Sequence, residues 1–369
     1  MKSIKCITAI FLLILVSCTP NMKQEESIAK DNSSKVFIIT LDGLRWQELF
    51  SGADSLLVGN DEYVNDVKEL KKEFWRETAM ERREILFPFI WSEVSKTGQI
   101  HGNRWKGSKM NLTNGMHFSY PGYNEILTGK ADDERINSND KIPNPNKTIL
   151  EIAEKTDIYS GKVAAFGSWD VFPYIINEKR SGLYVNAGFR KAKGANLSEK
   201  EVFLNELQDE IPSPWGSVRL DAFTHQFAVE TLKKKHPKLV YISYGETDDF
   251  AHDGKYDFYL KSANRTDNFI KKLWNFTQQD IFYKGKTTFI ITTDHGRGTE
   301  PLNTWRDHGS SIKNTDQVWV IAFGNKIEAK DEILSEEQLY TNQVVASIAK
   351  ILDIRIPSDS IGKPFSFIK

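Results

Sequence analysis

The stretch "TFIITTDHGRG", from Thr288 to Gly298, decides the fold of this chain. Its first part is apolar and β-branched, which is typical of a buried strand. The run then stops at an adjacent aspartate and histidine, Asp294 and His295, which are followed by glycine. Such a pair is either a simple turn or a pair of metal ligands at the rim of a sheet. The choice depends on whether other strands end in the same way.

Two further predicted strands lead into acidic residues. Asp42 directly follows "VFIITL", Val36–Leu41, and Asp248 comes shortly after "LVYISY", Leu239–Tyr244. One such ending would be explained by a helix cap or a turn. Ligands of open α/β sheets bind outside the carboxyl ends of the strands, so three such endings favour a shared site.

The rest of the chain alternates between strand and helix patterns. Candidate strands also occur at Lys162–Phe166 and Val318–Phe323, and helical patterns lie at 146–155, 217–235, 256–278 and 336–352. Apolar strands separated by helices predict a mainly parallel sheet covered on both faces, which is a three-layer α/β/α sandwich. Segments near 51–115 and 170–215 are rich in aromatic and turn-forming residues, and we expect them to form cap insertions above the sheet.

The N-terminus has the pattern of an export signal. Residues 1–18, "MKSIKCITAIFLLILVSC", combine two lysines with an apolar run that is too short for a comfortable transmembrane helix. The segment ends in Leu15-Val16-Ser17-Cys18, which resembles the bacterial lipobox, whose cysteine is acylated. The alternative is a plain signal peptide with an accidental cysteine. We therefore expect an exported bacterial lipoprotein, anchored to the outer membrane through Cys18 on its periplasmic or cell-surface face.

The remaining composition bounds the fold and its partners. Residues 19–35 are polar and lack periodicity, so they are predicted to be a flexible tether before a single catalytic domain at 36–369. The only cysteines are Cys6 and Cys18, so this domain has neither a disulfide nor a thiol nucleophile. The formal net charge is -1, and no nucleic-acid polymer is expected as a partner.

Additional metal-ligand candidates lie near the strand ends. Asp248 and His252 are four residues apart, a spacing that places both on one face of a helical turn. His308 follows in "WRDHGSS". Aspartate and histidine together bind zinc and similar ions. Together with the residues at the strand ends, these candidate ligands are more than one catalytic ion requires, which suggests two divalent ions bridged by substrate. The full set is Asp42, Asp248, His252, Asp294, His295 and His308.

Five motifs in this order resemble the alkaline phosphatase superfamily, especially its nucleotide pyrophosphatase/phosphodiesterase-like branch. They are "TLDG" at Asp42, "FSYPGYNEILTG" around Ser119, the Asp248–His252 pair, "DHG" at Asp294 and a late "HG" at His308. The resemblance covers most of the chain, from Val36 to about Phe365. Each motif alone is unspecific, whereas all five in order are specific.

The resemblance implies two ions, zinc or a similar metal. One would be held by Asp42, Ser119, Asp294 and His295, and the other by Asp248, His252 and His308. It further implies that Ser119 is the nucleophile of a phosphoester hydrolase that forms a phospho-serine intermediate. Asn139 is a candidate donor to a phosphate oxygen, and Asn137 competes for that role. The expected substrate is a small-molecule or glycan-linked phosphate ester.

Two departures bear on substrate class. The phosphodiesterase branch has Asn-His after the proline, whereas Gly122-Tyr123 follow it here. Formylglycine sulfatases need an arginine where this chain has Tyr123. The alternatives are a sulfatase-like or phosphonate hydrolase on the same frame, and a non-catalytic ligand-binding lipoprotein. Trp169 and Asp170 either line the substrate pocket or belong to the core.

Overall fold

A computed structural model describes residues 31–356 and 362–369. The predicted signal segment 1–18, its Cys18 and most of the tether lie outside the described residues. The fold lies in the unit Ser33–Lys369. Across the described part of the chain, no helix combines the length and the apolar character needed to span a bilayer.

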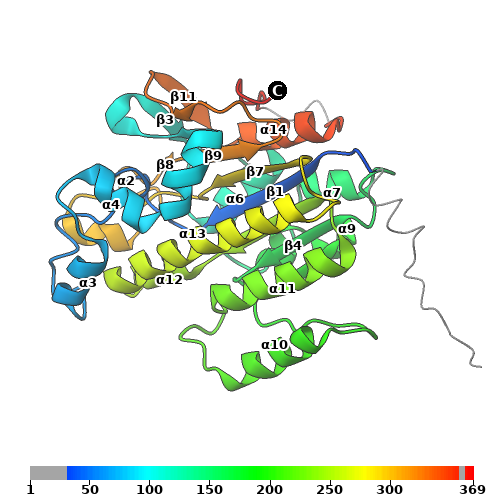
Figure 1. Cartoon of the computed structure of the whole chain (residues 1–369), viewed down its shortest axis with the longest axis horizontal. Coiled ribbons are helices and arrows are strands. Elements are labelled where there is room, and N and C mark those ends of the chain that lie inside the picture. Colours follow the sequence, from blue (N-terminus) through cyan, green and yellow to red (C-terminus); the bar gives the residue numbers. More distant parts are fainter. Residues whose placement is uncertain (1–30, 357–361) are drawn as a thin grey trace, which may run out of the picture. The chain divides into compact units, whose positions relative to one another are not determined.

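An eight-stranded sheet forms the centre of the unit Ser33–Lys369 (Figure 1). Strand β1 pairs in parallel with β6 on one side and β7 on the other, whereas β9 is antiparallel to both of its neighbours. The sheet is therefore mainly parallel. In spatial order its strands are β10 (Asp331–Glu332), β2 (Gly98–His101), β9 (Val320–Gly324), β7 (Thr287–Thr292), β1 (Lys35–Leu41), β6 (Leu239–Tyr244), β4 (Val163–Gly167) and β5 (Tyr184–Ala187).

Helices cover both faces of this sheet (Figure 1). Val36 and Ile38 of β1 belong to the hydrophobic core that includes the buried sides of α6 (Ser119–Thr128), α7 (Ile149–Glu154), α8 (Phe172–Ile175) and α14 (Gln343–Leu352). On the opposite face, Phe37 stacks on Phe289 with ring centroids 4.7 Å apart. Trp274 of α13 (Tyr256–Gln279) packs edge-on against Phe289, and α11 (Asp221–Lys235) lies beside it. The predicted three-layer α/β/α sandwich is confirmed.

A smaller sheet corrects two sequence predictions. It contains β11 (Glu337–Tyr340), β3 (Ser108–Asn111) and β8 (Gln317–Val318). The predicted strand Val318–Phe323 is divided at the buried Trp319, because β8 pairs with β3 of the smaller sheet whereas β9 pairs with β2 and β7 of the main sheet. The Trp319 indole N–H donates to the Leu44 carbonyl at 2.9 Å. The predicted helix 336–352 is wrong in its first turn, where β11 pairs with β3 instead.

The two predicted cap insertions are partly wrong, since each contributes a strand to the main sheet, β2 from the first and β5 from the second. Their other elements are mostly short helices, several of them begun by local caps. At α4, for example, Thr78 and Glu81 form a reciprocal capping box. The remaining helical segments are α2 (Trp46–Ser51), α3 (Val67–Phe74), α4 (Ala79–Leu86), η1 (Ile90–Val94), α5 (Ser95–Thr97), η2 (Arg104–Lys106), α9 (Glu178–Ser181), α10 (Glu199–Glu210), α12 (Glu246–His252) and η3 (Leu302–Arg306).

Candidate metal centre

The ends of three neighbouring strands bring the predicted ligands together. Asp42 follows β1, and Asp294 comes shortly after β7, whose Thr292 lies opposite Thr40 of β1. On the other side of β1, β6 leads into α12, which contains Asp248 and His252. Because these strands are parallel, their carboxyl ends meet at one edge of the sheet.

Asp42, Asp294 and His295 form a compact group that we call the first cluster. Each offers one ligand atom, and these atoms all lie within 4.8 Å of one another. The His295 Nε2 is 3.3 Å from Asp42 Oδ1 and 3.5 Å from Asp294 Oδ2. No residue of the cluster is more than 5% exposed. The three predicted ligands therefore share one buried position.

In each carboxylate of the first cluster, one oxygen accepts a hydrogen bond and the other accepts none from the part of the chain that the structure describes. The Tyr123 hydroxyl donates to Asp42 Oδ2 at 2.8 Å, and the Gly43 amide donates to Asp294 Oδ1 at 3.1 Å. Among the described residues, Asp42 Oδ1 and Asp294 Oδ2 are buried without a hydrogen-bond partner. Burying a carboxylate oxygen without a donor or cation is costly. Two such oxygens beside an imidazole nitrogen fit the ligand set of zinc or a similar divalent ion.

Asp248, His252 and His308 form the second cluster. The His252 Nε2 is 3.3 Å from Asp248 Oδ2 and 3.0 Å from His308 Nε2, and His308 Nε2 is 3.8 Å from Asp248 Oδ1. The side chains are 14%, 41% and 13% exposed, in that order. The structure thus brings the second predicted set together as well, in a more open setting.

His295 lies between the two clusters. Its Nε2 is also 3.7 Å from Asp248 Oδ1, and its ring centroid is 4.0 Å from that of His308. The His295 Nδ1 lies 3.0 Å from the Gly296 carbonyl, which can only accept a hydrogen bond. This contact assigns a proton to Nδ1, so that in the neutral imidazole the Nε2 lone pair is the one available to an ion.

Ser119 occupies the first position of α6. Its Oγ is 3.4 Å from His295 Nε2, which places the predicted nucleophile at the first cluster. The stretch "SYPGY" is the buried first part of α6, and Ser119 is only 5% exposed. A helix N-terminus directs backbone N–H groups outward, and this arrangement favours phosphoryl oxygens.

Comparison with known proteins supports a metalloenzyme. Residues 188–354, just under half of the chain, match the model of the Metalloenzyme superfamily. A 2,3-bisphosphoglycerate-independent phosphoglycerate mutase of Campylobacter jejuni (strain 81-176) is 24% identical over 169 residues. That match covers 44% of this chain and 32% of the mutase, so the chain spans about a third of this relative's length.

Solved structures are similar over nearly the whole chain. The alkaline phosphatase PafA aligns with 9% identity and a TM-score of 0.56, covering 91% of this chain and 99% of PafA. The fold is alkaline phosphatase-like. The phosphonate monoester hydrolase SpPMH from Silicibacter pomeroyi aligns at 12% identity and a TM-score of 0.53, covering 90% of this chain and 76% of the hydrolase. A 2-O GAG sulfatase aligns at 12% identity and a TM-score of 0.52, covering 90% of this chain and 73% of the sulfatase.

These matches confirm the predicted resemblance: part of the chain matches the Metalloenzyme superfamily, and its fold is similar to that of an alkaline phosphatase. They group this fold with a phosphatase, a phosphonate hydrolase and a sulfatase. Assignment to the nucleotide pyrophosphatase/phosphodiesterase-like branch stays a prediction.

The two clusters differ in how their surroundings shift the pKa values of their side chains. Burial opposes the charged imidazole of His295, but the carboxylates of Asp294 and Asp42 outweigh burial and raise its pKa to about 9. Burial and the neighbouring Asp42 raise the pKa of Asp294 well above its ordinary range. In the second cluster, burial and then the charge of His295 lower the pKa of both His252 and His308. In metal-free protein, the side chains of the first cluster therefore keep their protons to higher pH than the histidines of the second cluster do.

Asn139 bonds to the residue that follows Ser119, the predicted nucleophile. Its Oδ1 accepts a hydrogen bond from the Tyr120 backbone N–H at 3.0 Å, directly after Ser119 in the first turn of α6. Its amide NH₂ is therefore the group that remains for a phosphoryl oxygen. Asn137 instead donates to the Glu134 carbonyl at 3.3 Å. The geometry favours Asn139 over Asn137 for the proposed donor.

Sequence reasoning missed two residues that hold the ligands. Tyr123 bonds to Asp42, and the buried Arg297 contacts Asp248 Oδ1. The Arg297 Nε also donates to the Gly43 carbonyl at 3.1 Å. Gly43 has φ +57°, and a Cβ there would lie 2.8 Å from Asp248 Oδ1, so the "TLDG" motif needs its glycine. The signal available in the sequence was the arginine of "DHGRG" itself.

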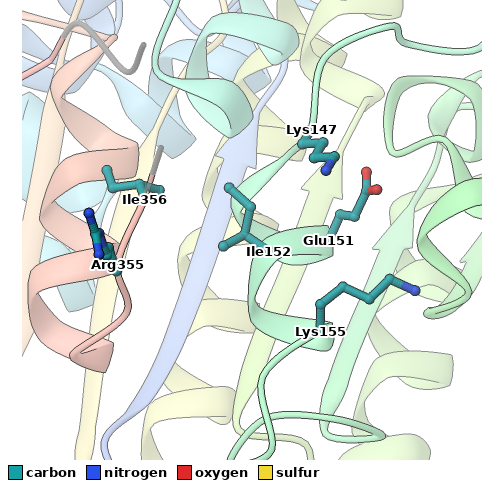
Figure 2. Close-up of a pocket in the computed structure, with 6 residues that line it drawn as sticks. All are labelled: Lys147, Glu151, Ile152, Lys155, Arg355 and Ile356. Carbon is teal, nitrogen blue, oxygen red and sulfur yellow. The ribbon is translucent and has the colours of Figure 1, made fainter. Parts of the chain in front are cut away.

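The other two candidate positions, Trp169 and Asp170, have partners elsewhere in the fold. Asp170 pairs with Lys141 at 2.6 Å, and the partly buried Trp169 packs against the core. A separate pocket of about 420 Å³ contains no predicted site residue among its lining side chains (Figure 2). Figure 2 shows the α7 side facing the segment after α14 across it; the lining residues are Lys147, Glu151, Ile152, Lys155, Arg355 and Ile356.

Proposed function

We propose that this protein hydrolyses phosphate esters with two bound divalent ions, zinc or a similar metal, and with Ser119 as nucleophile. The observation that carries the proposal is the 3.4 Å separation between Ser119 Oγ and His295 Nε2. It sets a hydroxyl against a cluster in which Asp42 Oδ1 and Asp294 Oδ2 are buried and lack a hydrogen-bond partner among the described residues. A protein that only bound a ligand would not need a nucleophile at that point.

In this proposal, the candidate ligands are shared between two ions. The first cluster and Ser119 would hold one ion, and the second cluster would hold the other. Bound there, the ions supply Lewis acidity that lowers the pKa of the serine hydroxyl and stabilises negative charge on phosphoryl oxygens. The hydrogen bond from His295 Nδ1 to the Gly296 carbonyl fixes the orientation of the ring.

The chain's own groups then carry out two displacements. Ser119 Oγ loses its proton and forms a bond to phosphorus, while the bond from phosphorus to the leaving oxygen breaks and that oxygen takes up a proton. Water next attacks the phospho-serine, phosphate leaves, and Ser119 regains its proton. The Ser119 backbone N–H at the start of α6 and the Asn139 amide NH₂ would hold the phosphoryl oxygens during both steps, since the Tyr120 N–H is engaged by Asn139 and residue 121 is a proline.

Phosphate is favoured over sulfate on two grounds. A phosphate ester carries more negative charge than the matching sulfate, and divalent ions stabilise that charge better. The formylglycine route needs an arginine where this chain has Tyr123, and Tyr123 is fully buried and bonded to Asp42. An unmodified serine therefore suits phosphoryl transfer. The proposed substrate is a small-molecule or glycan-linked phosphate ester, and we propose no role for a nucleic-acid polymer.

A substrate panel tests this function. Mature, zinc-loaded protein is assayed with p-nitrophenyl phosphate, its bis-ester, the phenylphosphonate and the sulfate. We expect one or both phosphate esters to react much faster than the sulfate. Asn139→Ala should lower kcat/KM about tenfold by removing one oxygen-binding donor, whereas Asn137→Ala should not. Sulfate as the best substrate would overturn the assignment, and zinc binding without any turnover would favour a ligand-binding lipoprotein.

We also propose that the protein is exported and held at the outer membrane by a lipid on Cys18. The support is the signal pattern and the Leu15-Val16-Ser17-Cys18 sequence. Cys18→Ser should move the protein out of the membrane fraction or block its processing. Fractionation and intact-mass analysis check this, and unchanged partition with unchanged mass would contradict acylation.

A further inference from the structure

The helix that carries Ser119 packs directly on the backbone of the first cluster. A Cβ built on Gly122 would lie 2.2 Å from the Asp294 carbonyl oxygen and 2.9 Å from its carbonyl carbon. These distances are far inside van der Waals contact, so only glycine permits this approach. The start of α6 is therefore held against the Asp294–His295 segment.

The residue after this glycine reaches across to the other carboxylate. Tyr123 is fully buried, and its hydroxyl donates to Asp42 Oδ2 at 2.8 Å. The same hydroxyl oxygen accepts a hydrogen bond from Ser243 Oγ at 3.0 Å. This second contact assigns the tyrosine proton to Asp42. The ring is held edge-on by Phe172, with centroids 4.8 Å apart.

We propose that Tyr123 is a positioning residue for the first cluster, acting through Asp42 on metal affinity; the inference rests on the proposed two-metal function. With Oδ2 engaged by the tyrosine, Asp42 presents Oδ1 toward His295 Nε2 at 3.3 Å. Oδ1 is buried and has no hydrogen-bond partner among the described residues. The tyrosine thus selects which carboxylate oxygen is left for an ion.

This role gives the Gly122-Tyr123 pair a physical meaning. Both residues replace the Asn-His expected after the proline, and both contact a carboxylate residue of the first cluster. Gly122 admits the helix, and Tyr123 fixes one ligand atom. Hydrogen bonds from outer residues to metal ligands typically change metal affinity by about 10- to 100-fold.

The test is Tyr123→Phe, which removes only the hydroxyl. Zinc affinity is measured by competition with a chromophoric chelator, resolving both equivalents. We expect one of the two equivalents to weaken by about 10- to 100-fold. Excess zinc should restore most of the lost turnover, because the hydroxyl does not touch substrate. Ser243→Ala, which removes the donor to the tyrosine oxygen, should weaken the same equivalent by a smaller factor.

Tyr244→Phe is the matched control. Tyr244 is also a fully buried tyrosine, and its hydroxyl bonds to His225 at 3.0 Å, away from the clusters. It should lower thermal stability without changing either zinc equivalent. Wild-type zinc affinity in Tyr123→Phe would overturn the positioning role, as would equal weakening in Tyr244→Phe. If Tyr123→Phe does not fold, unchanged affinity in Ser243→Ala overturns it. Failure of wild-type protein to bind zinc would instead overturn the proposed function.

Discussion

The first and second clusters use the same kinds of ligand in different surroundings. The first lies at the ends of two paired strands, β1 and β7, and its residues are at most 5% exposed. The second is built from α12 and from the segment after η3, and its His252 side chain is 41% exposed. Strand ends are held on both sides by sheet neighbours, whereas a short helix and a loop are not. The comparison suggests a rigid site beside a more exchangeable one.

The way each aspartate is held differs too. Neutral donors, the Tyr123 hydroxyl and the Gly43 amide, bind the carboxylates of the first cluster. In the second cluster the guanidinium of Arg297 contacts Asp248. A neutral donor leaves the full negative charge for an ion, whereas a cation offsets part of it. We therefore expect the first cluster to bind a divalent ion more tightly than the second.

The largest effect is expected at the hydroxyl beside the first cluster. Ser119→Ala should lower turnover by at least ~10³-fold, because the attacking atom is removed. The change deletes one small polar atom, so the melting temperature should move little. The control is Ser262→Ala, which removes another buried hydroxyl; this one donates to the Tyr259 backbone carbonyl within α13. Near-normal kcat in Ser119→Ala would place the nucleophile elsewhere.

The next effect concerns the buried carboxylate. Asp294→Asn should weaken the binding of one zinc equivalent by at least ~10²-fold. This loss exceeds the one expected from removing a hydrogen bond to a ligand, because a ligand itself is changed. Without metal the same change should stabilise the fold. The folded-state pKa of Asp294 is raised by burial and Asp42, so this carboxyl costs stability as pH rises above its ordinary value of about 4. Chelator competition and metal-free melting curves at several pH values check both parts.

A smaller loss is expected in the open cluster. His252→Ala should weaken only the other zinc equivalent, by about tenfold, because its exposed imidazole can be replaced by water as a ligand. The Asp294→Asn protein provides the comparison. If His252→Ala and Asp294→Asn weakened the same equivalent, the division into two sites would be wrong.

The smallest effect is a difference in proton binding in metal-free protein. The pKa of His295 is raised to about 9, whereas burial and His295 lower the pKa of His252. Because the pKa of His295 is raised on folding, its contribution to stability is present below its ordinary value near 6.5 and is lost as pH rises through about 9. NMR titration of labelled histidines should show one imidazole titrating near 9. His295→Gln should remove that signal, and no such signal in wild-type protein would contradict the assignment.

Much of the site could be predicted because the strand topology of an α/β sheet brings the ligand candidates together. Asp42 and Asp294 follow recognisable buried strands, and parallel strands bring their carboxyl ends to one edge. The Asp248–His252 spacing needed only one helical turn, and α12 supplies it. These inferences depend on local periodicity and on the general geometry of α/β sheets.

Other features depend on contacts between distant parts of the chain. The run Val318–Phe323 is apolar throughout, so its division at Trp319 follows from the different strands with which its two parts pair, β3 on one side and β2 and β7 on the other. Residues 337–340 were expected to be helical, but pairing with β3 makes them a strand. Local propensity is a weak preference that such pairing overrides.

Taken alone, the sequence determined the layered α/β class and the identity of the ligand candidates, because these depend on residue type and short-range spacing. Only the tertiary structure decided which oxygen of each carboxylate is left for an ion. That choice depends on the Tyr123 hydroxyl, the Gly43 amide and the Arg297 guanidinium reaching ligands from other segments of the chain. Hydrogen bonds of this kind are set by three-dimensional distance, which no spacing along the chain encodes.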